Sequence, residues 1–184
     1  MHAMRTALRA AAASVAMTLA AMAAAPEPAG LWTGQMVSET PATLKGAQVL
    51  DLASLERLLA SRPLLVDSGP APRKPANLPA GTLWTPVHRS IPGAVWFPGA
   101  GRGDLAADRA DALLARIEEL SGGDRTRPIV SFCQPRCWGS WNVGKRLVGA
   151  GFSDVYWFPA GVDGWQEQKD TAPVDPQPGW APPP

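Results

Sequence analysis

The sequence predicts an α/β fold, with a mostly parallel central sheet covered by helices on both faces. Short apolar segments of strand length alternate along the chain with segments that repeat their apolar residues at helical spacing. Strands of a parallel sheet are buried on both faces and therefore appear as continuous apolar runs. The 184-residue chain is long enough for one domain with its own core.

The first half of the chain contains one predicted helix and two predicted strands. The segment DLASLERLLA (51–60) places its four leucines on one face of a helix. The runs PLLVD (63–67) and AVWF (94–97) have the length and composition of buried strands. Between them, residues 68–90 are too rich in proline and glycine for regular structure, and we expect a long surface loop.

The second half predicts a helix, a strand, a helix and a strand in turn. Residues 104–121 form the clearest helix, with acidic residues in its first turn. PIVSF (128–132) is a buried strand, and residues 140–151 form a helix that begins at a serine cap and ends at a glycine. DVYWF (154–158) is the last strand. These alternating elements give the parallel sheet.

The first 25 residues have the layout of a secretory signal peptide. Arg5 and Arg9 precede an alanine-rich apolar stretch that ends in small residues. This stretch is shorter than the roughly 20 residues that a membrane span needs. Removing the two arginines leaves 15 of the 17 basic residues against 16 acidic ones. We therefore expect an exported protein without basic surfaces for nucleic acid or a membrane.

The remaining chain divides into three parts. Residues 26–46 form an extended lead-in, residues 47–170 form the folded domain, and residues 171–184 form a proline-rich tail that we expect to be extended or disordered. One domain therefore holds every candidate site residue.

The two cysteines, Cys133 and Cys137, are the candidate catalytic residues. Ligands of open α/β sheets bind at the carboxyl ends of strands, and Cys133 directly follows the strand 128–132. The helix expected from Ser140 directs its positive end toward this point. We expect the loop to aim backbone N–H groups at the Cys133 sulfur. These donors belong to Gln134, Arg136, Trp138 and Gly139.

Four interpretations of the cysteine pair remain open from the residues alone: a redox or persulfide-relay couple, a nucleophilic Cys133 beside a packing Cys137, a structural disulfide, or a metal site. A disulfide across so short a loop stabilises by only ~2 kcal/mol. A zinc site would need both thiolates, His88 and a carboxylate, because His88 is the only histidine after the leader. We therefore expect no metal, and we interpret His88 as a loop residue or a histidine with its hydrogen bonds satisfied, not as a general acid.

Charged and aromatic residues could support the site. Arg136 and Arg89 are the candidate cations for stabilising a thiolate. Trp138 and Trp141 flank the cysteines, and Trp84 and Trp96 could approach from other segments. These tryptophans either pack in the core or form an aromatic wall that shields the sulfur.

The segments PIVSFC and GKRLVGAGFSDVYWFPAGVDGW resemble the catalytic half of rhodanese-like domains. PLLVDS (63–68) and SIPGAVWFPG (90–99) are similar to two further segments of that family, and the resemblance extends from about residue 47 to 168. It implies a rhodanese-like fold in which Cys133 forms a persulfide and no cofactor is needed. It also places Asp67 as the acid that ends the family's second strand.

The segments GLWTG, CWGSWNVGKR and VYWFPAGVDGW resemble a narrower group, exported rhodanese-like proteins with a CXXCW motif that are associated with pyrroloquinoline quinone (PQQ)-dependent alcohol catabolism. This resemblance implies a periplasmic location. The implied partners are a small sulfur donor or a thiol partner protein, together with components of a PQQ-dependent dehydrogenase system. Here three residues, not two, separate the cysteines.

The cysteine loop departs from active rhodaneses, which usually have arginine directly after the nucleophile. Gln134 and Pro135 follow Cys133 here. Gly139 stands where related dual-specificity phosphatases need an arginine to hold phosphate, which argues against phosphatase chemistry. Two hypotheses remain: a Cys133-based sulfur-transfer or thiol-redox protein, and a non-catalytic accessory or ligand-binding protein of a PQQ-dependent alcohol oxidation system.

Overall fold

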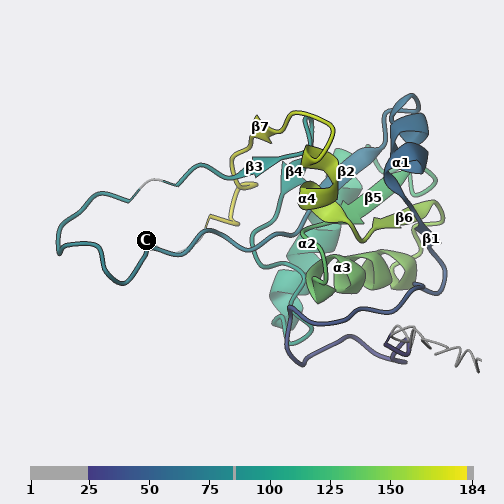
Figure 1. Ribbon diagram of the computed structural model, residues 1–184. Coiled ribbons are helices and arrows are strands. Elements are labelled where there is room, and N and C mark those ends of the chain that lie inside the picture. Colours follow the sequence, from purple (N-terminus) through teal and green to yellow (C-terminus); the bar gives the residue numbers. More distant parts are fainter. Residues whose placement is uncertain (1–24, 85, 182–184) are drawn as a thin grey trace, which may run out of the picture.

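The structure is a computed structural model that describes residues 25–84 and 86–181. Its central sheet has five strands in the order β1-β6-β5-β2-β4, and every neighbouring pair is parallel (Figure 1). The strands are β1 (Gln48–Val49), β2 (Leu64–Asp67), β4 (Val95–Trp96), β5 (Ile129–Phe132) and β6 (Val155–Phe158). The predicted parallel sheet is confirmed.

Helices cover both faces of this sheet, as predicted. Helices α2 (Ala107–Leu120) and α3 (Trp138–Gly149) contribute to the apolar cluster on one face. Helices α1 (Leu52–Leu59) and α4 (Gly161–Gln166) contribute to the cluster on the other. Strand β2 serves both clusters because successive side chains of a strand point to opposite faces.

The sequence did not predict the shortest elements. Strands β3 (Arg89–Ser90) and β7 (Ala172–Pro173) pair antiparallel in a second, two-stranded sheet. Strand β1 and helix α4 were also missed. Each of these elements has two to six residues, too few to display a period in the sequence.

The lead-in packs across the start of α3. The side-chain oxygen of Asn142 accepts from the Trp32 N–H at 2.8 Å, and its nitrogen donates to the Trp32 carbonyl at 2.8 Å. The Trp32 ring stacks on Trp138 with 4.3 Å between centroids. The Trp138 N–H donates to the Met36 carbonyl at 2.9 Å. These contacts start α3 at Trp138 with Cys137 as its N-cap, not at Ser140 as predicted.

The described part of the tail, residues 171–181, packs on the domain, although the sequence analysis expected an extended or disordered segment. Strand β7 joins it to β3, and Trp180 further along has only 4% of its surface exposed. Trp180 packs edge-on against Phe97, and the guanidinium of Arg109 lies 3.9 Å from its ring centroid. One buried indole removes enough apolar area from water to hold an otherwise proline-spaced segment in place.

The leader predicted at 1–25 lies outside the described residues except for Ala25. Within residues 25–84 and 86–181, no helix has both the length and the apolar character needed to cross a membrane.

We predict that Trp180→Ala lowers the free energy of unfolding by about 3 kcal/mol, because it removes a large buried side chain from the contact with Phe97. Trp84→Ala is the matched control: Trp84 is 38% exposed, and we expect a change of about 0.5 kcal/mol or less. Urea denaturation of both variants measures the difference. Equal stabilities would contradict the docking of the tail.

Candidate functional site

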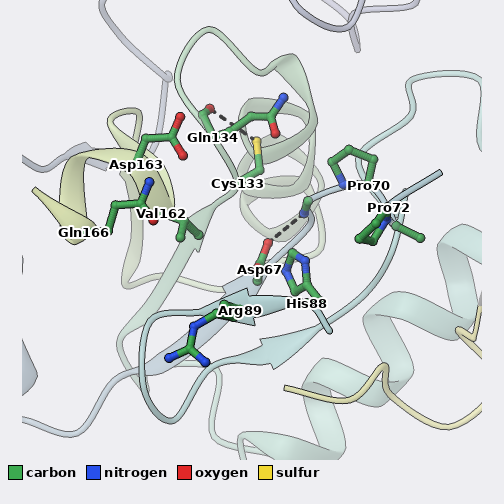
Figure 2. Close-up of a pocket in the computed structure, with 12 residues that line it drawn as sticks. Asp67, Pro70, Pro72, His88, Arg89, Cys133, Gln134, Val162, Asp163 and Gln166 are labelled. Atoms are coloured by element: carbon green, nitrogen blue, oxygen red, sulfur yellow. Dashed lines mark hydrogen bonds and ion pairs between the residues drawn. The ribbon is translucent and has the colours of Figure 1, made fainter. Parts of the chain in front are cut away.

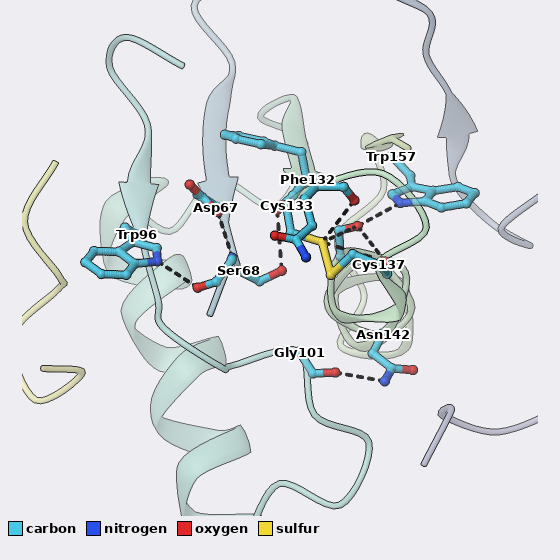
Figure 3. Close-up of a disulfide and its surroundings, with 12 residues drawn as sticks. Asp67, Ser68, Trp96, Gly101, Phe132, Cys133, Cys137, Asn142 and Trp157 are labelled. Carbon is cyan, nitrogen blue, oxygen red and sulfur yellow. Dashed lines mark hydrogen bonds between the residues drawn. A yellow bond between two sulfur atoms is a disulfide. The ribbon is translucent and has the colours of Figure 1, made fainter. Parts of the chain in front are cut away.

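A disulfide joins Cys133 to Cys137 at the carboxyl end of β5 (Figure 3). The two Cα atoms are 6.5 Å apart. Both residues are buried, with 2% and 6% of their surface exposed. Cys133 therefore lies at the end of the strand after which the sequence placed it. The structure shows the oxidised state, in which the two cysteines are bonded to each other. Among the described residues, no group of three or more histidine, cysteine or acidic residues could hold a metal ion.

Ser140 lies next to the Cys133 sulfur. Its hydroxyl oxygen is 3.3 Å from Cys133 Sγ and accepts a hydrogen bond from the Trp157 indole N–H at 3.0 Å. The hydroxyl hydrogen is therefore available to the Cys137 carbonyl, 3.3 Å away, or to a Cys133 thiolate after reduction. Ser140, predicted as a helix cap and as a supporting residue of the site, lies close enough to donate a hydrogen bond to the Cys133 sulfur once the disulfide is reduced.

The expected cradle of backbone N–H groups is not formed in the disulfide state. The other polar neighbours of Cys133 Sγ are carbonyl oxygens, those of Gln134 at 3.7 Å and Cys137 at 3.6 Å. The Trp138 N–H is held by Met36 in the lead-in, and the Arg136 carbonyl accepts from the Ser38 N–H. Among the described residues, none of the backbone N–H groups of Gln134, Arg136 and Gly139 donates a hydrogen bond to the Cys133 sulfur. A neutral disulfide offers no charge for such groups to stabilise.

Neither arginine supplies the cation expected beside the sulfur. The Arg136 guanidinium pairs with Glu39 at 2.9 Å, and both side chains are more than half exposed. Arg89 lines the same pocket as Cys133, but its guanidinium donates to the Thr171 hydroxyl at 3.0 Å and to the Thr171 carbonyl. In Figure 2 this guanidinium points away from Cys133.

The fully buried Asp67 ties together both ends of a projecting loop, residues 70–84 and 86–87, here called the arm (Figure 1). Its Oδ1 accepts from the Gly69 N–H at 2.7 Å, and its Oδ2 accepts from the Ser90 hydroxyl at 2.6 Å. His88 Nε2 lies 2.8 Å from Oδ2, with the imidazole stacked on Trp96 at 3.9 Å between centroids. The Trp96 indole donates to the Gly69 carbonyl at 2.8 Å.

A polar pocket of about 390 Å³ opens beside Cys133 (Figure 2). Its walls include Asp67 and His88 on one side and Asp163 and Gln166 of helix α4 on the other. The contact of His88 with Asp67 agrees with the interpretation of a hydrogen-bonded histidine, but its position beside Cys133 was not predicted. Its partner Asp67 is 21 positions away, and no local spacing in the sequence signals that contact.

A larger cavity of about 1160 Å³ adjoins the pocket and shares Pro70, Ala71, Pro72 and Gln134 with it. It is called the cleft below. The arm, the lead-in and the tail all contribute to its walls, and Cys137 and Gly139 line it. Cys133 lines the pocket and not the cleft, whereas Cys137 lines the cleft and not the pocket. Each sulfur of the disulfide therefore belongs to a residue that borders a different cavity.

The tryptophans near the cysteines pack in the core. Trp138 and Trp141 are 1% and 0% exposed and form one cluster with Trp157. Trp96 supports the His88 ring, and Trp84 lines the cleft. Core packing, one of the two predicted roles, is therefore the role that the structure shows for Trp138 and Trp141.

The sequence matches no family model, and no curated protein matches it. Comparison of the fold with solved structures finds sulfurtransferases. A thiosulfate sulfurtransferase from Pseudomonas aeruginosa is 19% identical with a TM-score of 0.44, over 68% of this chain and 20% of that protein. A homodimeric polysulfide-sulfur transferase from Wolinella succinogenes is 19% identical with a TM-score of 0.44, over 73% of this chain and 83% of that one.

A 3-mercaptopyruvate sulfurtransferase from Escherichia coli, described by its rhodanese fold, is 23% identical with a TM-score of 0.37, over 67% of this chain and 43% of that protein. The chain thus spans only about a fifth of the Pseudomonas protein. At identities below 25% and TM-scores below 0.5, this likeness assigns neither a family nor an activity to the chain.

We predict that Ser140→Ala slows alkylation of Cys133 in the reduced protein about tenfold at neutral pH, because a hydrogen bond to a charged group contributes ~1.5 kcal/mol and favours the thiolate. Ser131→Ala is the control, since Ser131 is also buried but donates to the Tyr156 carbonyl. Iodoacetamide labelling followed by peptide mass spectrometry separates Cys133 from Cys137. Equal rates in both variants would show that Ser140 does not contact the thiolate.

We predict that Asp67→Asn lowers the free energy of unfolding by about 1–3 kcal/mol, because the amide nitrogen cannot accept the bonds that one carboxylate oxygen accepts. Hydrogen exchange at the Gly69 N–H, which donates to Asp67 Oδ1, should be faster in this variant than in the wild-type protein. Asp163→Asn serves as the comparison, since Asp163 lines the same pocket and is exposed. Unchanged exchange at Gly69 in the Asp67 variant would refute the role of this carboxylate in holding the arm.

Proposed function

We propose that the chain is a periplasmic, rhodanese-like protein in which Cys133 and Cys137 carry out sulfur transfer through a thiol-redox cycle. The observation that carries this proposal is the bond between the two cysteines beside a polar pocket at the end of β5. The rhodanese-like motifs support the chemistry, and the leader supports the location. The link to PQQ-dependent alcohol catabolism rests on the resemblance of CWGSWNVGKR and its neighbouring segments.

The cycle begins with the reduced protein. The Cys133 thiolate attacks the outer sulfur of a donor such as thiosulfate, and the sulfur–sulfur bond of the donor breaks. Sulfite leaves with the bonding electron pair, and Cys133 becomes a persulfide. Ser140, 3.3 Å from Cys133 Sγ, is placed to donate to the attacking sulfur.

The second step uses Cys137. Its thiolate attacks the Cys133 sulfur of the persulfide, and the outer sulfur leaves as hydrosulfide with the electron pair of the broken bond. The protein is left with the Cys133–Cys137 disulfide, which supports the resolving role of Cys137. An external dithiol then supplies two electrons and two protons, becomes a disulfide itself and restores both thiols.

A second candidate is a non-catalytic accessory protein of a PQQ-dependent alcohol oxidation system that binds a ligand or partner through the same cavities. It is favoured by the engagement of the Trp138 N–H and both candidate arginines away from the sulfur. A Cys133→Ser variant that fully restores growth on alcohol would favour this function, and complete loss of growth would favour the sulfur cycle.

We predict that the reduced Cys137→Ser variant, mixed with thiosulfate or polysulfide, gains the mass of one sulfur atom on Cys133. The persulfide should accumulate because its resolving thiol is missing. The wild-type protein should instead re-form the disulfide and release one sulfide per disulfide, measured colorimetrically. Cys133→Ser is the control and should gain nothing at residue 133. An unlabelled Cys133 in the reduced Cys137→Ser variant would overturn the proposed cycle.

A further inference from the structure

The two cavities beside the disulfide differ in size and in charge. The pocket beside Cys133 has a volume of about 390 Å³, and its wall carries both signs of charge, since Asp67, Asp163 and Arg89 all line it. The cleft beside Cys137 is about 1160 Å³, and no aspartate or glutamate of the described residues lines it. Small-molecule pockets typically measure about 300–1,000 Å³, so the pocket has the size for a small donor and the cleft exceeds that range.

Four cationic side chains line the cleft: Arg73, Lys74, Arg102 and Arg109. Arg102 is paired with Asp104 at 2.6 Å. The ion pairs found within the described residues do not include the other three cations. The cleft therefore presents positive charge that no carboxylate of its own walls balances.

The same cleft exposes apolar side chains. On the arm, Leu83 is 84% exposed and Trp84 is 38% exposed, and both line the cleft. On the lead-in, Val37 is 49% exposed and faces the cleft from the other side. Large exposed apolar side chains gathered around one concave surface are typical of a binding site for another molecule.

We propose that the cleft binds an acidic and apolar polypeptide segment of a partner thiol protein, whose cysteine reduces the disulfide by attacking Cys137. The proposal rests on the proposed function and names the partner that closes its cycle. The positive charge of the cleft selects an acidic segment, and its volume and exposed apolar rim fit a polypeptide better than a small thiol.

The contact of Ser140 supports attack at Cys137. In thiol–disulfide exchange the sulfur that is better stabilised as a thiolate leaves faster. Ser140 Oγ lies 3.3 Å from Cys133 Sγ, so Cys133 is the sulfur with a hydroxyl donor beside it. Cys133 is therefore the leaving group, and the attack falls on Cys137 from the cleft.

The exchange balances as follows. The partner's thiolate forms a bond to Cys137 Sγ, the Cys133–Cys137 bond breaks, and Cys133 leaves as a thiolate beside the pocket. A second thiol of the partner then attacks the partner's own sulfur in the mixed disulfide and releases Cys137. The partner dithiol loses two electrons to become a disulfide, and this protein gains them as two thiols.

The test uses two synthetic peptides of equal length, each with one cysteine flanked by leucine and tryptophan, one with glutamates and the other with lysines. Oxidised wild-type protein is mixed with each peptide at low ionic strength, and freed thiols are trapped with N-ethylmaleimide. The rate of each peptide is divided by the rate of the neutral thiol 2-mercaptoethanol with the same protein. We expect this normalised rate to be about tenfold higher for the acidic peptide than for the basic one. Mass spectrometry should find the peptide on Cys137 and maleimide on Cys133.

The double variant Arg73→Glu/Lys74→Glu should abolish or reverse this preference. A matched control, Lys45→Glu/Arg57→Glu, makes the same charge change on exposed residues outside the cleft and should keep the preference. Equal rates for the two peptides, an unaffected preference in the cleft variant, or the peptide attached to Cys133 would each overturn the inference.

The proposed function is tested separately by sulfur labelling of Cys133. If thiosulfate labels Cys133 in the Cys137→Ser variant while the peptides show no preference, the sulfur cycle stands and the partner assignment is wrong. If the peptides discriminate but no sulfur reaches Cys133, the cleft binds its partner and the sulfur cycle is wrong.

Discussion

The buried carboxylate of Asp67 is the constraint on which the site depends. A charge removed from water is tolerated only when donors surround it, and the Gly69 N–H and the Ser90 hydroxyl supply two such donors, with His88 Nε2 within hydrogen-bond distance. Because Gly69 and His88 stand at the two ends of the arm, the same contacts fix where the arm leaves and rejoins the domain. The arm in turn contributes walls to both cavities, so this one carboxylate shapes the surroundings of each sulfur.

The lead-in determines what kind of chemistry the cysteine loop can support. By accepting a hydrogen bond from the backbone N–H of Trp138, it occupies a donor that could otherwise stabilise an anion in the loop. Stabilisation of the Cys133 thiolate therefore depends on Ser140 in place of a ring of amides. Cys137 is close enough to bond to Cys133, so its thiol can attack an intermediate on Cys133 although the loop provides no ring of amides.

Local patterns predicted the fold and the position of Cys133, and contacts between distant segments decided the rest. Strand β5 and helix α2 are continuous or periodic over enough residues to be recognised in the sequence. The link between Asp67 and His88 and the docking of Trp180 on Phe97 join residues that no spacing rule connects. Arg136 looked like a partner for the sulfur because it is close in sequence, yet Glu39, almost a hundred positions earlier, neutralises it.

The positive charge of the cleft comes from where the basic residues lie in the fold, and not from an excess of basic residues in the sequence. The chain after its leader has 15 basic and 16 acidic residues, so an average surface would mix the two signs. Around the cleft the signs are separated: of the described residues, four cations and no acidic side chain line it, whereas the pocket beside Cys133 is lined by both signs, Asp67 and Asp163 together with Arg89. Positive charge beside Cys137 favours an acidic partner at that sulfur, whereas the mixed charge beside Cys133 does not exclude an anionic sulfur donor.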